Sequence, residues 1–221
     1  MSLNRTIIKR DTDIPVFLEW IGTRDTVLDL GCGRGELLVR LALEKNVHGF
    51  GIERNPQKVA ICLERGVNVV QGDILSLLRT LPDQSFDWVV CSRILQELDN
   101  PAEIILQSLR VGRHLAIAFV NNGHWRNRLS MLRYGNRIRN SIYPNPWYQS
   151  DPANPVSIKD FEDFCLHYGI TVDRRRYHAG DWKTPRALMP KLLAGYGIYA
   201  LSRPRLTRPV LQKPRAGVPA S

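Results

Sequence analysis

The chain has 221 residues, of which 43% are hydrophobic, and this suits one α/β domain with a substantial core. No apolar run approaches the ~18 residues that a membrane-spanning helix needs, so we expect no membrane partner. The formal net charge is +10, but the basic residues gather after residue 124. Neither a zinc-finger spacing nor an RNA-binding aromatic motif accompanies them, which argues against nucleic acid as a partner.

The cysteines and the N-terminal residues indicate the cellular compartment of the protein. The cysteines are scattered without metal-ligand spacing, at Cys32, Cys62, Cys91 and Cys165. Unpaired thiols of this kind are typical of a reducing compartment, so a cytoplasmic protein without a metal site is expected. The first thirteen residues lack a hydrophobic signal region, which agrees with that localisation.

Residues 11–21 predict the first helix, because apolar residues recur there at helical spacing, namely at Ile14, Phe17, Leu18 and Ile21. A buried strand is predicted over residues 26–31, followed by a glycine turn and a helix over residues 35–45. Strand, glycine turn and helix together bring backbone N–H groups and a helix N-terminus up to a ligand. We therefore expect a nucleotide site at this turn, with the first helix covering one edge of it.

The spacing within the turn differs from that of a dinucleotide site. A G-x-G-x-x-G site has its last glycine where Glu36 stands in this chain. The carboxylate of Asp29 would repel a pyrophosphate and attract a cationic amino-acid ligand. The D-x-G-x-G-x-G pattern resembles motif I of the class I S-adenosylmethionine (SAM) methyltransferases, in which this turn wraps the methionine part of the cofactor. The cofactor-binding residues predicted here are Asp29, Gly31, Cys32, Gly33 and Gly35. A glycine turn without a ligand is the alternative.

A second strand, predicted over residues 47–53, ends in an acidic residue. Glu53 lies about 20 residues after the first glycine of the turn, where a carboxylate can accept hydrogen bonds from ribose hydroxyls. Glu53 and its neighbour Arg54 therefore join the predicted cofactor-binding residues. They do not distinguish SAM from NAD, because both cofactors carry such a ribose.

The third strand, predicted over residues 67–71, runs into Gly72, Asp73 and Ile74. The methyltransferase resemblance implies that Asp73 hydrogen-bonds the adenine amino group, with Ile74 beside it. Asp73 also suits the N-cap of a helix over residues 74–80, and both roles can hold together.

The fourth strand, predicted over residues 86–91, leads to polar residues that belong near the transferred methyl group. In a doubly wound sheet, ligands bind outside the carboxyl ends of the central strands, and the first and fourth strands flank that switch point. Ser92, Arg93 and Gln96 therefore join the predicted site. The alternative is that they are ordinary polar loop residues.

Asn-Pro pairs open two of the crossover helices, with asparagine as N-cap and proline at the first helical position. These helices run from Asn55 to Gly66 and from Asn100 to Gly112. A fifth strand is predicted over residues 114–120.

An arginine-rich and aromatic insertion is predicted at about residues 121–156, on the ligand side of the sheet. Long insertions there commonly form substrate or partner surfaces, and aromatic residues interleave the arginines over residues 124–148. The alternative is a solvated basic cover. His124 is the candidate catalytic base, although a loop histidine that bonds the backbone is the commoner reading.

The C-terminal part predicts an antiparallel ending. Ser157 and Asp160 suggest a capping box for the next helix, and strands are predicted over residues 170–177 and 197–201, with a short helix near 186–193 between them. The fold class is thus a doubly wound, mostly parallel seven-stranded α/β sheet with an antiparallel last strand. We expect one domain over residues 1–202 and a disordered basic tail over residues 203–221.

Five runs together resemble the methionine biosynthesis protein MetW family, over about residues 12–202. They are Val-Leu-Asp-Leu-Gly-Cys-Gly (27–33), Gly-Val-Asn-Val-Val-Gln-Gly-Asp (66–73), Ser-Phe-Asp-Trp-Val-Val (85–90), Asn-Gly-His-Trp-Arg (122–126) and Ile-Lys-Asp-Phe-Glu-Asp (158–163). Arg34 and Arg93 depart from the family pattern and add positive charge near the expected cofactor.

The resemblance implies two functions. One is a SAM-dependent methyltransferase with an unidentified acceptor, a reaction in which the protein mainly positions the reactants. The other is a non-catalytic companion or regulator of homoserine O-acyltransferase, with residues 124–148 as the docking face, because aromatic and arginine residues are enriched in such interfaces.

Overall fold

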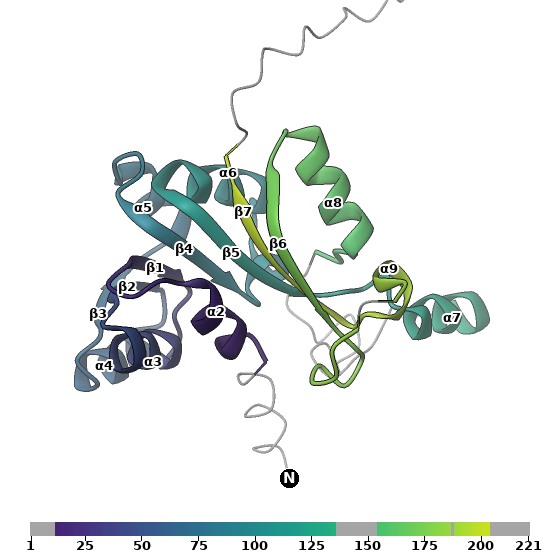
Figure 1. The fold of residues 1–221 in the computed structure, drawn as a ribbon, viewed down its shortest axis with the longest axis horizontal. Helices are drawn as coiled ribbons and strands as arrows, with labels where there is room; N and C mark the ends of the chain where they lie inside the picture. Colours follow the sequence, from purple (N-terminus) through teal and green to yellow (C-terminus); the bar gives the residue numbers. More distant parts are fainter. Residues whose placement is uncertain (1–11, 136–153, 187, 204–221) are drawn as a thin grey trace, which may run out of the picture.

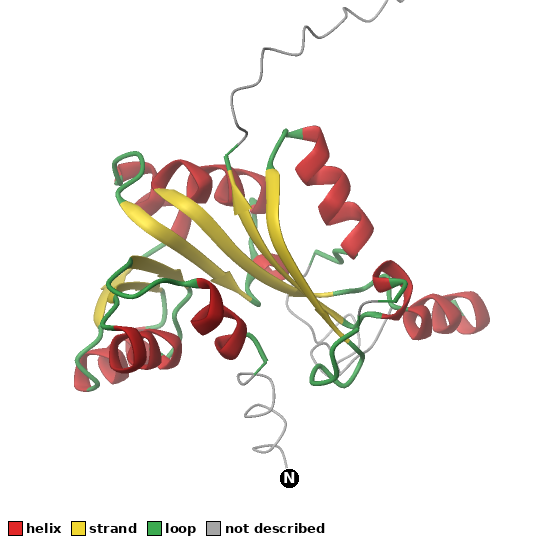
Figure 2. Cartoon of the chain, viewed as in Figure 1, coloured by secondary structure: helices red, strands yellow, loops and turns green. Residues whose placement is uncertain are grey.

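One seven-stranded sheet organises the molecule, in the order β3-β2-β1-β4-β5-β7-β6 (Figure 1 and Figure 2). The computed structural model describes residues 12–135, 154–186 and 188–203. The strands are β1 (Thr26–Leu30), β2 (His48–Glu53), β3 (Asn68–Gln71), β4 (Phe86–Ser92), β5 (Gly112–Val120), β6 (Thr171–His178) and β7 (Tyr196–Ser202). Pairing is parallel from β3 across to β5, and β7 runs antiparallel to both β5 and β6. The predicted fold class is confirmed.

Helices cover both faces of the sheet. They are α2 (Ile14–Trp20), α3 (Glu36–Lys45), α4 (Pro56–Glu64), α5 (Ile74–Thr80), α6 (Pro101–Val111), α7 (Trp125–Tyr134), α8 (Ile158–His167) and α9 (Pro190–Leu193), with a 3-10 turn η1 (Leu95–Glu97) after β4. The buried residues of α2, α3 and α4 belong to one apolar cluster, and those of α5, α6 and α8 belong to the other. Figure 1 shows these two layers on opposite sides of the sheet.

The central strands read as continuous apolar runs because both of their faces are covered. In β5, every residue from Leu115 to Val120 is buried. At the β5–β7 end of the sheet, Phe119 packs on Phe161 of α8 and on Tyr199 of β7, with ring centroids 4.7 Å and 5.8 Å away. This aromatic cluster holds α8 on the sheet and fixes the edge that carries the C-terminal hairpin.

The strand order reverses between β1 and β4, which lie side by side at the centre of the sheet. The loops that leave the carboxyl ends of these two strands must diverge to opposite faces, and this opens a crevice for ligands. The glycine turn leaves β1 and the Ser92–Arg93 pair ends β4 at that crevice, as the sequence predicts.

Three local predictions are corrected by the structure. The segment after β5 forms the helix α7, where the sequence predicts only an insertion, and this helix has no buried residue. The helix expected near residues 186–193 is only Pro190–Leu193. The helix α6 begins at Pro101 as expected, but the Asn100 side chain makes no capping hydrogen bond. The caps at Asn55 and Ser157 are confirmed.

Parts of two predicted segments lie outside the described residues. These are residues 136–153 of the insertion and residues 204–221 of the tail. Arg203, the first tail residue, donates to the Leu109 carbonyl at 2.8 Å. Within the described ranges, every helix is too short or too polar to cross a bilayer.

Candidate functional site

The glycine turn combines left-handed backbone with an open approach. Gly33 has φ +63°, and a Cβ built on it would meet nothing within 4 Å. Gly35 has φ +74°, but a Cβ there would come within 3.0 Å of the Val67 side chain. Gly35 is therefore needed for close packing of α3, whereas the space beside Gly33 is free for a ligand.

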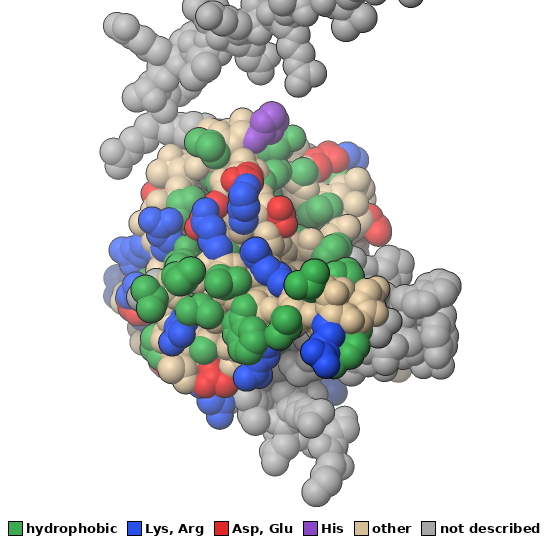
Figure 3. Space-filling view, turned by 90° about the vertical axis from the view of Figure 1, so that its right-hand side faces the viewer, with side chains coloured by type: hydrophobic (Ala, Val, Ile, Leu, Met, Phe, Trp, Pro, Cys, Tyr) green, Lys and Arg blue, Asp and Glu red, His purple; other side chains and the backbone are tan. Residues whose placement is uncertain are grey.

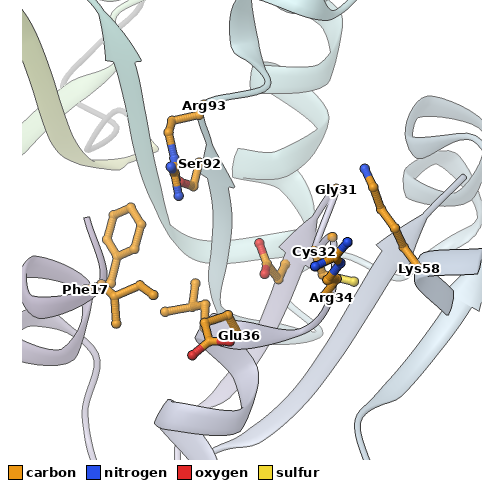
Figure 4. A pocket seen from close by; sticks show the side chains of 12 residues that line it. Phe17, Gly31, Cys32, Arg34, Glu36, Lys58, Ser92 and Arg93 are labelled. Carbon is orange, nitrogen blue, oxygen red and sulfur yellow. The ribbon is translucent and has the colours of Figure 1, made fainter. Parts of the chain in front are cut away.

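A cavity of about 230 Å³ lies against this turn. We call it the turn cavity; its walls include Asp29, Gly31, Cys32 and Gly33 from the turn, Ile14 and Phe17 from α2, and Ser92 and Arg93 from the end of β4. Figure 4 shows Phe17, Ser92 and Arg93 across the cavity from the turn. Ile14 and Phe17 place the first helix at one edge of this cavity.

Asp29 supplies a buried carboxylate to this cavity. Its side chain is only 5% exposed. Burial raises the pKa of Asp29 to about 7, with the Arg93 guanidinium opposing the rise and the Glu53 carboxylate adding to it. A cationic ligand beside Asp29 would favour the ionised form of the carboxyl group. Binding of such a ligand near neutral pH would therefore release a proton from Asp29.

Glu53 is held rigidly behind the turn. Its two carboxylate oxygens accept hydrogen bonds from the backbone N–H of Gly33 at 3.0 Å and of Asn55 at 2.9 Å. A carboxylate has about four acceptor positions, so capacity remains for a ligand's hydroxyl groups. Its neighbour Arg54 is exposed. These two backbone hydrogen bonds hold the Glu53 side chain in place at the end of β2 without any contact from a ligand.

The end of β3 joins this edge. The Gly72 N–H donates to the Glu53 carbonyl at 3.2 Å, so residues 72–74 lie beside the end of β2. Asp73 caps α5 by accepting from the Ser76 N–H at 2.9 Å, and this bond holds the pKa of Asp73 below its usual value. The capping role of Asp73 is therefore observed, while Gly72, Asp73 and Ile74 stand apart from the walls of the turn cavity.

Sequence reasoning missed Asp13, which lies just before α2 and is 1% exposed. Its Oδ2 accepts a short hydrogen bond from the Ser92 hydroxyl and lies 3.1 Å from Arg93 Nε. Burial raises the pKa of Asp13, and Arg93 opposes that rise. The charge of Arg93 is thus balanced across the cavity wall, while Arg34 is exposed to solvent. No motif could have signalled Asp13, because its partners lie about 80 residues away along the chain.

Gln96 is buried beside the carboxyl end of β5, where its Oε1 accepts from the Val120 N–H at 3.3 Å. It is not among the residues that line the turn cavity. The structure thus brings Ser92 to that cavity and leaves Gln96 between the ends of β4 and β5.

His124 lines a different cavity, of about 410 Å³, at the start of α7. We call it the α7 cavity; its walls are His124, Trp125, Arg126, Ala179, Gly180, Asp181, Arg186 and Leu193. Burial, and then the Arg126 charge, lower the pKa of His124. The imidazole is therefore neutral at physiological pH, and its cavity is lined by none of the residues that line the turn cavity.

A family model described as methionine biosynthesis protein MetW matches residues 11–201 of the chain. The chain belongs to the MetW family. A bifunctional methionine biosynthesis protein MetXA/MetW of Rhodopirellula baltica is 27% identical over 175 residues, which are 75% of this chain. The match spans only 28% of that relative's length.

Two solved structures share the fold. A SAM-dependent methyltransferase from Archaeoglobus fulgidus has a TM-score of 0.64 at 18% identity, covering 90% of this chain and 94% of the other. A Haemonchus contortus phosphoethanolamine N-methyltransferase 2, in complex with phosphomonomethylethanolamine and S-adenosylhomocysteine, has a TM-score of 0.66 at 13% identity. That match covers 88% of this MetW-family chain and 53% of the neighbour. At these identities the likeness establishes the fold alone.

Proposed function

We propose that this MetW-family protein binds SAM at the turn cavity and positions it for methyl transfer to an acceptor. The observation that carries the proposal is the open space beside Gly33, flanked by the carboxylates of Asp29 and Glu53. Space for close backbone approach, with buried negative charge next to it, suits a ligand that joins an amino acid, a sulfonium cation and a ribose.

The residues divide between the parts of the cofactor. Asp29, Gly31, Cys32 and Gly33 would surround the methionine part in a cavity of about 230 Å³, and Gly35 would complete the turn behind them. Glu53 would accept from the ribose, with Arg54 beside it, and Gly72, Asp73 and Ile74 would flank the adenine along the ends of β2 and β3. Ser92 and Gln96 would lie toward the methyl group.

When bound, SAM supplies a methyl group on a good leaving group. The chain's own contribution is then positioning and exclusion of water, for which the Ile14 and Phe17 side chains of α2 are suited. Among the described residues, the wall of the turn cavity holds no histidine or tyrosine. The Asp29 carboxylate in that wall would face the cationic part of the cofactor, so we assign it to binding and assign no catalytic base there.

Calorimetric titration of SAM and S-adenosylhomocysteine into the purified protein tests this proposal. We expect one saturable site in the wild type. The Glu44→Gln variant should bind equally well, because the Glu44 carboxylate pairs with Arg40 on the surface of α3 and lies outside the turn cavity. Absence of binding by the wild type, both alone and mixed with homoserine O-acyltransferase, would reject the cofactor site.

A second function is favoured by the exposed surface of α7. Leu129, Leu132 and Tyr134 are more than half exposed on a helix that contributes nothing to the core. Figure 3, which faces the end of the molecule where α7 and α9 lie, shows apolar side chains gathered among lysines and arginines. Such a mixture of apolar and cationic side chains suits a protein interface.

We propose homoserine O-acyltransferase as the partner at this surface. The Rhodopirellula baltica relative is a bifunctional MetXA/MetW protein, which supports an association of the two activities. A double Leu129→Glu and Leu132→Glu variant should lose co-purification with the acyltransferase while keeping its melting temperature. Leu166→Glu, on an 82% exposed leucine of α8, is the matched control. Retained co-purification of the α7 double variant would move the docking face elsewhere.

A further inference from the structure

The α7 cavity lies apart from the proposed cofactor site and carries excess positive charge. Its two arginines, Arg126 and Arg186, form no ion pair among the described residues. The carboxylate in the wall, Asp181, accepts from the Thr184 hydroxyl at 2.6 Å and from two backbone N–H groups of its own turn at 3.0 Å. Its hydrogen-bonding capacity is thus largely committed within the loop, and it offsets only one guanidinium.

The other walls suit an organic ligand. The Trp125 indole lies beside Arg126, whose guanidinium carbon is 5.4 Å from the ring centroid. The neutral His124 imidazole faces Gly180, since a Cβ built there would lie 3.5 Å from the imidazole Cε1 and Nε2. The cavity volume of about 410 Å³ falls within the roughly 300–1,000 Å³ typical of small-molecule sites.

A buried asparagine joins the α7 wall of the cavity to the α9 wall. Asn121 is 1% exposed, and its Oδ1 accepts from the N–H groups of Gly123 at 2.9 Å and Ile158 at 3.1 Å. Its Nδ2 donates to the Ala194 carbonyl at 2.7 Å. These bonds tie the start of α7 to the start of α8 and the end of α9. The α7 and α9 walls of the cavity are therefore held in place by a satisfied buried network.

We propose that the α7 cavity is a binding site for a small organic anion, a carboxylate or a phosphate, held between the guanidinium groups of Arg126 and Arg186. Arginine forks match both anions through paired charge-assisted hydrogen bonds. His124 donates one further hydrogen bond through whichever ring nitrogen carries the proton, and Trp125 covers the apolar part of the ligand. This site does not depend on SAM binding at the glycine turn.

Titration of the full chain with inorganic phosphate and with succinate tests the proposal and separates the two anions. We expect saturable binding of at least one probe to the wild type. Arg126→Gln and Arg186→Gln should each weaken it by ~10-fold or more, because each removes a charged donor. Arg133→Gln, the same change on the same helix but outside the cavity, should bind like the wild type.

Two further observations localise the anion. A Gly180→Leu variant keeps both arginines but fills the space in front of His124, so it should block binding. The His124 imidazole proton resonances, assigned with a His124→Gln variant, should shift on titration of the wild type. The proposal is overturned if neither probe saturates the wild type, if both arginine variants bind as the wild type does, or if Arg34→Gln abolishes binding instead, because Arg34 lines the turn cavity. It is also overturned if the His124 signals stay still.

Discussion

The two cavities along the carboxyl edge of the sheet are built in opposite ways. The turn cavity includes buried groups at the ends of β1 and β4, and its Arg93 guanidinium is paired with the buried Asp13 carboxylate. The α7 cavity is walled by loops and by a helix without buried residues, and its arginines have no carboxylate partners within the described ranges. The first is integral to the core, and the second is an addition at the edge.

Because of this difference, ligand or partner binding can be changed without loss of stability at α7 but not at the turn cavity. Substitutions at the turn cavity disturb the packing of α2 and α3 as well as any ligand. Substitutions on α7 should change binding alone, because the helix buries nothing. Variants at the two sites should therefore differ in how far they change stability and binding.

Asp13→Ala should destabilise the protein strongly, since it removes the buried carboxylate that pairs with the Arg93 guanidinium and accepts from the Ser92 hydroxyl. We expect a loss of about 2–4 kcal/mol in the free energy of unfolding, measured by urea denaturation. Glu19→Ala breaks the exposed pair of Glu19 with Arg176, which also joins α2 to another element, and should cost less than about 1 kcal/mol. Equal losses in the two variants would contradict the integral role of the Asp13 pair.

Asp29 should make stability depend on pH. The pKa of Asp29 is about 7 in the folded protein, against the ordinary 3.8. Between these values unfolding releases a proton, so the stability of the wild type should fall as pH rises from about 4 to 7 and then level off. Thermal denaturation of the wild type and of Asp29→Asn across this pH range measures the contribution of Asp29. The melting temperature of the variant should rise relative to that of the wild type as the pH increases. A constant difference would mean that Asp29 ionises normally.

Glu53→Gln should weaken SAM binding by ~10–150-fold, or ~1.5–3 kcal/mol, because an amide offers the ribose a weaker acceptor than a carboxylate. Calorimetry at constant pH measures the change, with the melting temperature as a check on the backbone bonds to Gly33 and Asn55. Affinity equal to that of the wild type would remove Glu53 from the ribose site.

Leu132→Ser on α7 should change the free energy of unfolding by less than about 0.5 kcal/mol, because this leucine is 85% exposed. Leu41→Ala on α3, where the side chain is fully buried, should cost about 2–5 kcal/mol. Chemical denaturation of both variants gives the comparison. A large loss from Leu132→Ser would show that α7 packs against part of the chain that the structure does not describe.

The sequence by itself determined the order of strands and helices, the glycine turn and the positions of Asp29 and Glu53. Those features follow from local periodicity, from capping residues and from the ends of consecutive strands. The switch point followed as well, because parallel strands joined by right-handed crossovers leave few arrangements.

Only the tertiary structure decided which distant groups meet. It paired Asp13 with Arg93, separated His124 from the turn cavity, brought Arg186 to Arg126, and gave Asn121 its role between three elements. It also left α7 without a buried residue, so the apolar side chains of that helix lie on the surface. Contacts of this kind depend on how the chain folds over long separations, which no local pattern of apolar and polar residues records.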